Sequence, residues 1–239
     1  MTPNLLLLRT GKKRRANFFC GDDKLKAMHL ISLMLLAIAI ARPGTAIAGM
    51  PELLEAERRG DWPSVVREYE ALARQGNAMA MYNLSLSYAR GRGVQRDDRK
   101  SFFWATESAK RGFAPAMHSM GVFYDEGTGG VQRNVTEAFR WFLAAANAGH
   151  PDSMFNIGQM YVTGEGTTAN YVEGYAWTKL TLVTPKEPWS KMGSNDAMAN
   201  IQRNLEVARR RMSSAELARA ENLFVQRQAA LRRNVQSNR

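Results

Sequence analysis

Residues Tyr69–Asp97 read YEALARQGNAMAMYNLSLSYARGRGVQRD, and the chain repeats this pattern twice more. The second copy is ATESAKRGFAPAMHSMGVFYDEGTGGVQRN from Ala105, and the third is FLAAANAGHPDSMFNIGQMYVTGEGTTAN from Phe142. Each copy has a glycine at the same place, at steps of 36 and 37 residues: Gly76, Gly112 and Gly149. A period of this length predicts a solenoid of stacked supersecondary units.

Each copy predicts two helices joined by a turn at this glycine, which reaches the left-handed conformation without steric cost. The first helix has a tryptophan at a fixed position: Trp104, Trp141 and Trp177. The second helix has a tyrosine near its end: Tyr88, Tyr124 and Tyr161. One such hairpin cannot bury its own apolar face, whereas stacked copies can. We therefore expect an all-α fold, an α-solenoid of about four stacked antiparallel helix pairs, because Trp177 begins a further unit.

The spacing A-x-x-W, Ala-x-x-Gly and A-x-x-x-L-G-x-x-Y-x-x-G-x-G-V resembles the Sel-one-like repeat family, a branch of the tetratricopeptide-like α-solenoids. Gly121 and Gly158 match the glycine that this family has in its second helix, whereas Ser85 replaces it in the first copy. The first copy also has Glu68 where the later copies have tryptophan. The resemblance implies that the tryptophans pack between helices and that the protein is an adaptor that binds other proteins.

Five segments are predicted along the chain: a signal peptide with its n-region extension (1–48), a short leading helix (49–60), the repeat solenoid (61–183), a helical C-terminal cap (184–231) and a flexible basic tail (232–239). The cap predicts two helices after a loop. The first covers Asp196–Arg211, and the second begins at a capping box formed by Ser213 and Glu216 and ends near Leu231.

The leader has the layout of a secretory signal peptide. Its apolar stretch, LISLMLLAIAIA over Leu30–Ala41, is too short to span a bilayer, which needs about 20 residues. Lys24 and Lys26 precede it and Ala46-Ile47-Ala48 follows it, so we expect cleavage after Ala48, whether translation starts at Met1 or Met28. A buried helix or a membrane anchor is the alternative. An exported chain of this kind is expected in the periplasm of a Gram-negative bacterium, or secreted from it.

The positive charge lies outside the repeats. The whole chain carries 33 − 22 = +11, of which residues 1–48 contribute 8 − 2 = +6 and residues 200–239 contribute 9 − 3 = +6, which leaves −1 for the part between them. A nucleic-acid-binding function is therefore not predicted, because no basic face belongs to the repeats. The C-terminal arginines predict a solvated cap face, with contact to anionic lipid or an acidic partner as the alternative.

No catalytic, cofactor-binding or metal-binding residues are predicted. The one cysteine, Cys20, lies in the leader, so the mature chain has no thiol nucleophile, disulfide or cysteine ligand. His150 follows the turn glycine and is expected to cap a helix, and His118 is expected on a solvated helix face. The alternative is a hydrolase or binding protein directed at β-lactams or peptidoglycan, as linked to cysteine-rich relatives. The missing cysteines and the absence of S-x-x-K count against it.

Candidate partner-binding residues lie on the first helices, one residue before each tryptophan position and three residues further on. This set predicts a protein-binding groove with apolar groups rimmed by charge: Arg67, Glu70, Phe103, Thr106, Arg140, Leu143 and Lys179. Ala176 occupies the same register in the last unit. Phe103 is either exposed in this groove or packed between repeats. The predicted partner is another protein of the cell envelope. The resemblance allows a periplasmic regulator of envelope signalling or of exopolysaccharide production.

Overall fold

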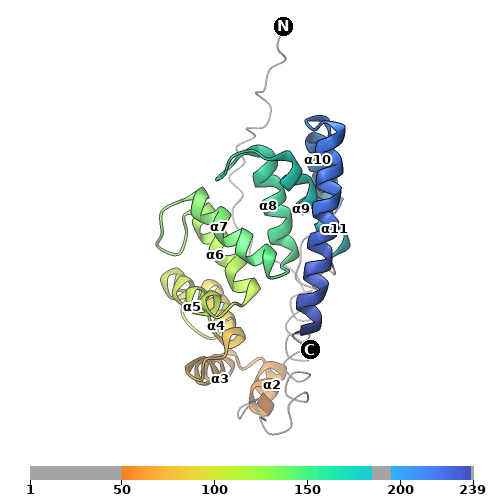
Figure 1. The fold of residues 1–239 in the computed structure, drawn as a ribbon. Coiled ribbons are helices and arrows are strands. Elements are labelled where there is room, and N and C mark those ends of the chain that lie inside the picture. The colour runs from red at the N-terminus through yellow and green to blue at the C-terminus, as the bar shows by residue number, and fades with distance from the viewer. Residues whose placement is uncertain (1–49, 185–194, 238–239) are drawn as a thin grey trace. The chain divides into compact units, whose positions relative to one another are not determined.

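A computed structural model of the chain describes residues 50–184 and 195–237, and the expected leader and the loop at 185–194 lie outside this part. The chain divides into two units, Met1–Ala46 and Ile47–Arg239, and all the described residues belong to the second. Only helices and turns occur in the described part (Figure 1). The helices are α2 (Met50–Arg59), α3 (Trp62–Arg74), α4 (Ala78–Arg90), α5 (Asp98–Lys110), α6 (Ala114–Glu126), α7 (Val135–Asn147), α8 (Pro151–Thr163), α9 (Tyr171–Val183), α10 (Asn195–Arg210) and α11 (Ser214–Ser237).

The helix pairs α3–α4, α5–α6 and α7–α8 are the three repeated units, and α9 begins the fourth. Short polar side chains start the first helices: Asp61, Asp97, Asn134 and Asn170 each accept a hydrogen bond from a backbone N–H of the first turn. This satisfies N–H groups that have no partner within the helix. The turn glycines have φ values of 87° at Gly76, 83° at Gly112 and 95° at Gly149, which confirms their predicted left-handed conformation.

Each second helix packs against the first helix of its own unit and the first helix of the next. The helices approach each other closely where they cross. A Cβ atom added at Gly121 would lie 2.5 Å from the ring of Phe142, and one added at Gly158 would clash with the hydroxyl of Thr178. In the first copy, Ser85 is tolerated at this position because its hydroxyl pairs with that of Ser101 in a buried contact of 3.1 Å.

The core continues from unit to unit through buried alanine, methionine and aromatic side chains. Trp177 is buried as expected, whereas Trp104 and Trp141 are half-buried. The repeat tyrosines contribute ring contacts, since Tyr124 packs edge-on against Phe102 and Tyr161 against Phe139. Such pairs add stability beyond the area that they bury.

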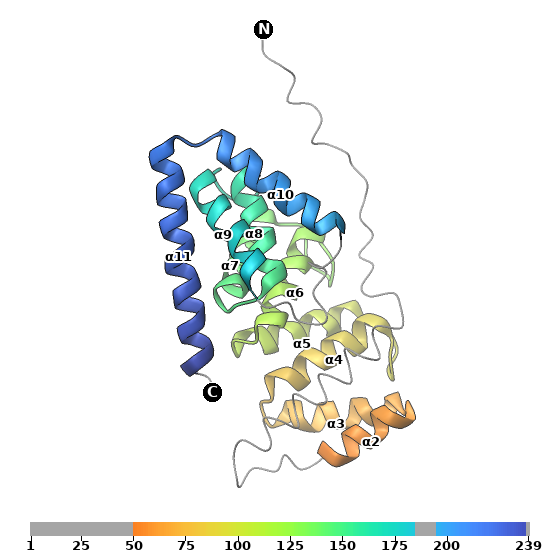
Figure 2. The same ribbon diagram turned by 90° about the vertical axis from the view of Figure 1, so that its right-hand side faces the viewer.

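The C-terminal pair α10–α11 closes the last unit. α10 packs against α8 and α9, and α11 packs against α9, on which it lies as a long helix beside the repeats (Figure 2). The predicted capping box is present, with the Ser213 hydroxyl accepting from the Glu216 N–H at 3.3 Å and the Glu216 carboxylate accepting from the Ser213 N–H at 2.9 Å. α11 continues past the expected end at Leu231 to Ser237. Leu231 packs against the core, which holds this part of the helix in place.

Candidate protein-interaction surface

We use the term first-helix ladder for the equivalent positions on the outer side of α3, α5, α7 and α9 that the sequence singled out. The first set consists of Arg67, Phe103, Arg140 and Ala176, and the second set, three residues later, of Glu70, Thr106, Leu143 and Lys179. Positions three residues apart lie on one side of a helix, one turn above the other. Arg67, Phe103 and Arg140 of the ladder are exposed on α3, α5 and α7, whereas Ala176 is buried on α9, against which α11 packs.

Phe103 of α5 is the large aromatic side chain that the described structure leaves most open to solvent, at 54% exposure. Its ring stands edge-on to Trp104, with centroids 5.2 Å apart and an interplanar angle of 75°. Of the two expectations for this residue, the exposed one is confirmed. The half-buried Trp104 indole packs on the exposed ring from one side, which restricts its orientation.

Arg67 of α3 and Arg140 of α7 are both exposed, and each is oriented by a residue one turn earlier on its own helix. Arg67 donates to the Ser64 hydroxyl at 2.7 Å, and Arg140 donates to the Glu137 carboxylate at 2.6 Å. Exposed pairs of this kind contribute little to folding stability. Both guanidinium groups therefore remain available to a ligand that offers a better acceptor.

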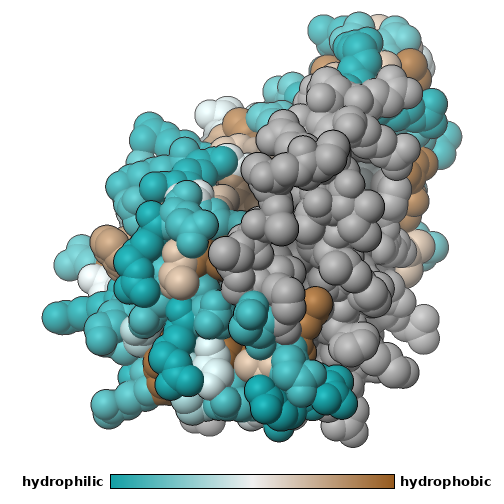
Figure 3. Space-filling view, turned by 90° about the horizontal axis from the view of Figure 1, so that it is seen from below, coloured by the Kyte–Doolittle hydropathy of each residue, from teal (hydrophilic) through white to brown (hydrophobic). Residues whose placement is uncertain are grey.

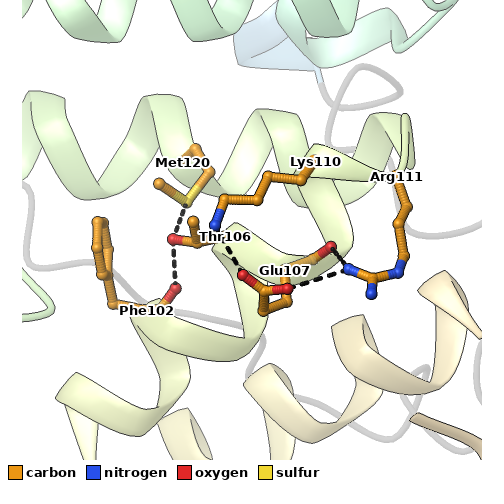
Figure 4. Close-up of polar contacts among 6 residues, drawn as sticks. All are labelled: Phe102, Thr106, Glu107, Lys110, Arg111 and Met120. Atoms are coloured by element: carbon orange, nitrogen blue, oxygen red, sulfur yellow. Dashed lines mark hydrogen bonds and ion pairs between the residues drawn. The ribbon is translucent and has the colours of Figure 1, made fainter. Parts of the chain in front are cut away.

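Thr106 differs from the expectation of an outward polar group. Its hydroxyl donates to the Phe102 carbonyl at 2.9 Å and lies 3.4 Å from the Met120 sulfur, as Figure 4 shows. The same figure shows the neighbouring Glu107 pairing with Lys110 and Arg111 at the end of α5. The Thr106 hydroxyl therefore stabilises the α5–α6 crossing and is already occupied by partners within the protein.

Leu143 and Glu70 are both half-buried. Leu143 packs against the core cluster of α7, α8 and α9, so its apolar side chain belongs partly to the repeat core. The open part of the ladder is thus an aromatic ring with flanking arginines and the edges of half-buried side chains.

The α9 end of the ladder is not open. Ala176 has no exposed surface, so the expectation that it lies on the groove surface is wrong. The cause is α11, whose side chains pack on this face of α9. Lys179 retains 30% side-chain exposure, and its ammonium group pairs with Glu221 of α11 and lies 4.9 Å from the ring centre of Phe224.

A second contact between the two helices is built around Trp177. The guanidinium of Arg227 lies over the indole at 4.1 Å from the ring centre and pairs with the Glu173 carboxylate at 2.7 Å. The third contact is a hydrogen bond of 2.9 Å from the Tyr175 hydroxyl to Glu221. Sequence reasoning missed all three because the partner residues on α11 are more than 40 positions away and follow no repeat pattern.

Electrostatics favours the charged state of the Glu221 carboxylate. Its pKa is lowered, chiefly by the hydrogen bond from Lys179 and further by that from Tyr175, although burial opposes this shift. The pKa of Tyr175 is raised, first by burial and then by its bond to the carboxylate. The Glu221 carboxylate therefore accepts hydrogen bonds from two donors, Tyr175 and Lys179. Two donors placed in this way favour a carboxylate at this position.

The α9–α11 interface is also incompletely satisfied. The Trp177 Nε1–H and one amino group of Arg227 are buried without a hydrogen-bond acceptor among the described residues. A buried donor without an acceptor costs about 1–3 kcal/mol. Such costs offset part of what the ion pairs and the apolar contacts contribute to this interface.

His118 and His150 also bear on the sequence expectations. His150 caps α8 as predicted, because its Nδ1 accepts from the Ser153 N–H at 3.4 Å. His118 does not lie on a solvated face: its ring stacks on His150, with centroids 4.4 Å apart, and its Nδ1 lies 2.8 Å from the Ser153 hydroxyl. Burial lowers the pKa of His150 to about 4. The pair packs α6 against α8 and is not part of the ladder.

The described residues that are visible in Figure 3 are mostly hydrophilic, with hydrophobic ones scattered among them. In the ranges that the structure describes, no helix is long and apolar enough to cross a bilayer.

The stacked helix pairs and their close glycine crossings define an α-solenoid built from helical repeats. The family model of the Sel1 repeat matches residues 78–113, 114–150 and 151–180. A solved Sel1 repeat protein from Oxalobacter formigenes is similar with a TM-score of 0.53 and 27% identity, over 63% of this chain and 58% of that one. This chain therefore contains three Sel1 repeats, over residues 78–180.

Two further relatives are more distant. A protective antigen of uropathogenic Escherichia coli with an SLR fold is 22% identical with a TM-score of 0.40, over 71% of this chain and 43% of that one. HRD3A of Arabidopsis thaliana, an ERAD-associated E3 ubiquitin-protein ligase component, is 37% identical over 72 residues. Those residues are 30% of this chain and 11% of the plant protein, so the chain matches only a small part of it.

Proposed function

We propose that this chain is an exported, non-enzymatic scaffold that binds a protein of the bacterial cell envelope through the open part of the first-helix ladder. Sel1 repeat proteins generally act as protein-interaction scaffolds, which supports the class of function. The single observation that supports this site is the exposure of Phe103. This aromatic side chain on α5 is 54% exposed, and Arg67 on α3 and Arg140 on α7 are exposed as well. Aromatic and arginine side chains are the residues that most often dominate binding energy at protein interfaces.

The export and the envelope location rest on the leader. Residues 30–41 have the length of a signal-peptide core, and small residues follow at 46–48. A regulatory role in envelope signalling or exopolysaccharide production is the finer form of this proposal.

The experiment is crosslinking and capture from whole cells with the tagged full chain, compared with the variants Phe103→Ser, Arg67→Glu and Arg140→Glu. We expect one envelope protein to be captured by the unmodified chain and lost with these variants. Matched controls are Val225→Ser, an apolar residue with 58% exposure on α11, and Arg203→Glu, an exposed arginine bonded to Asn200 one turn earlier on α10. Equal loss with the controls, or no loss with the ladder variants, would contradict the proposed surface.

A further inference from the structure

The C-terminal helix α11 shows what kind of helix packs on α9, at the last unit of the first-helix ladder. It is a separate helix that lies on the first helix of the last unit, where sequence reasoning placed a partner. Its contacting residues are Glu221, Phe224, Arg227 and Leu231. The first three are three positions apart in sequence, so they form one side of the helix over successive turns.

Each of these residues contacts its own group of side chains on α9 or in the adjoining core. Glu221 is held by Tyr175 and Lys179. Arg227 stacks on Trp177 and pairs with Glu173. Phe224 and Leu231 pack against the apolar cluster that α7, α8 and α9 share.

We infer that the ladder recognises a partner α-helix that carries an acidic residue, an aromatic residue and an arginine at three-residue spacing, and that this helix binds α9 in place of α11. The inference goes beyond the proposed function, because it concerns the α9 part of the ladder that α11 covers and not the open part around Phe103. A partner helix in the position of α11 makes the contacts that α11 makes and extends toward α7, where Arg140 and Leu143 continue the ladder.

Three features of α11 make the exchange physically reasonable. Its interface with α9 contains two ion pairs beside apolar contacts, and it leaves the Trp177 indole N–H and an Arg227 amino group without acceptors among the described residues. Its opposite side is open to solvent at Arg219, Asn222 and Gln226, so α9 is the main surface that holds it. Its composition is rich in alanine, leucine, glutamine and arginine, which favour helix formation, and a capping box starts it.

The test uses the full chain and a fluorescent peptide of residues 213–237 as the probe. The variant with Glu221→Lys and Arg227→Glu reverses both charges that α11 presents to α9 and leaves α9 unchanged. We expect faster amide hydrogen exchange in residues 214–231 of this variant and peptide binding about tenfold tighter than to the unmodified chain, in which α11 competes for the site. A peptide with the same two substitutions is expected to bind the variant about tenfold more weakly.

The matched control changes charges on the solvent side of α11 without altering its net charge, with Arg219→Glu, Asn222→Lys and Gln226→Lys. It is expected to behave as the unmodified chain in both measurements. Equal amide exchange in the two variants would show that the Glu221 and Arg227 contacts do not hold α11, which overturns the inference. A loosened α11 without peptide binding would overturn it as well, because α9 would then not accept a helix in trans.

A charge swap tests the same contact without loosening α11 through its own residues. Lys179→Glu is expected to abolish peptide binding, and a peptide with Glu221→Lys is expected to restore it. Failure of this rescue contradicts the inferred pairing. Capture of an envelope protein that depends on Phe103 but is not competed by the α11 peptide would overturn the inference and leave the proposed function standing.

Discussion

The imidazole rings of His118 and His150 lie nearly parallel, 4.4 Å between centroids and 12° between planes, although His118 lies on α6 and His150 caps α8. Ser153 joins them, since its hydroxyl lies 2.8 Å from Nδ1 of His118 and its N–H donates to Nδ1 of His150. His150 is buried, and this burial lowers its pKa from 6.5 to about 4, against the opposing effect of Asp152. His150 therefore packs as a neutral group at neutral pH.

This relationship predicts a pH-dependent stability. Below pH 6.5 the unfolded chain binds a proton at His150, whereas the folded chain does so only near pH 4. The free energy of unfolding is therefore expected to fall as the pH drops from 6.5 to 4, by up to about 3 kcal/mol from this group. Urea unfolding at pH 7.5 and 4.5 measures the change. His150→Asn keeps an N-cap acceptor but does not titrate, so its profile is expected to be flatter; parallel profiles for the two proteins would refute the assignment.

Gly158→Ala is expected to destabilise the fold by about 1–3 kcal/mol, because the added Cβ clashes with the Thr178 hydroxyl at the α8–α9 crossing. Chemical denaturation measures the loss. Combining it with Thr178→Ala removes the clashing hydroxyl and is expected to recover part of the stability. Gly76→Ala is the comparison, since its Cβ meets no atom within 4 Å and its cost, about 1–2 kcal/mol, comes from the left-handed backbone alone.

Phe103→Ala and Phe142→Ala are expected to separate binding from stability. Phe103 is 54% exposed, so its loss changes the free energy of unfolding by no more than about 0.5 kcal/mol. Phe142 is 4% exposed, and its truncation costs about 3–5 kcal/mol. Urea unfolding combined with partner capture tests both variants. A large stability loss at Phe103 would show that its ring supports the fold, in conflict with its proposed role as a binding anchor.

Processing of the leader gives a prediction that does not depend on the repeats. The mature protein is expected to begin at Gly49, because Ala46 and Ala48 have the small side chains that a signal peptidase requires. N-terminal sequencing of the protein from the periplasmic fraction checks this. Ala48→Lys is expected to leave the leader attached, whereas Thr45→Ser, outside this pair of alanines, is expected to leave cleavage unchanged. An uncleaved, cell-associated wild-type chain would favour the anchor alternative.

The amino-acid sequence by itself determined the helical repeats and the ends of their helices. The tryptophan, glycine and tyrosine positions recur every 36 or 37 residues, so the repeat is recognised from the sequence without knowledge of which residues these side chains contact. Gly112 ends α5 and Asn134 begins α7 for local reasons, the left-handed backbone in one case and a side-chain acceptor in the other. Local effects of this kind can be read from one segment of sequence at a time.

Only the tertiary structure decided which part of the ladder is open. α11 packs on α9 because Glu221 pairs with Lys179 and Arg227 stacks on Trp177. The residues of each pair are more than 40 positions apart in the sequence, and the repeat pattern does not predict these contacts. The stacking of His118 on His150 has the same origin, since it brings the start of α8 against α6, 32 positions earlier in the sequence. Such contacts arise from the complementarity of whole surfaces once the helices are packed, so the periodic pattern that predicts the solenoid carries no information about them.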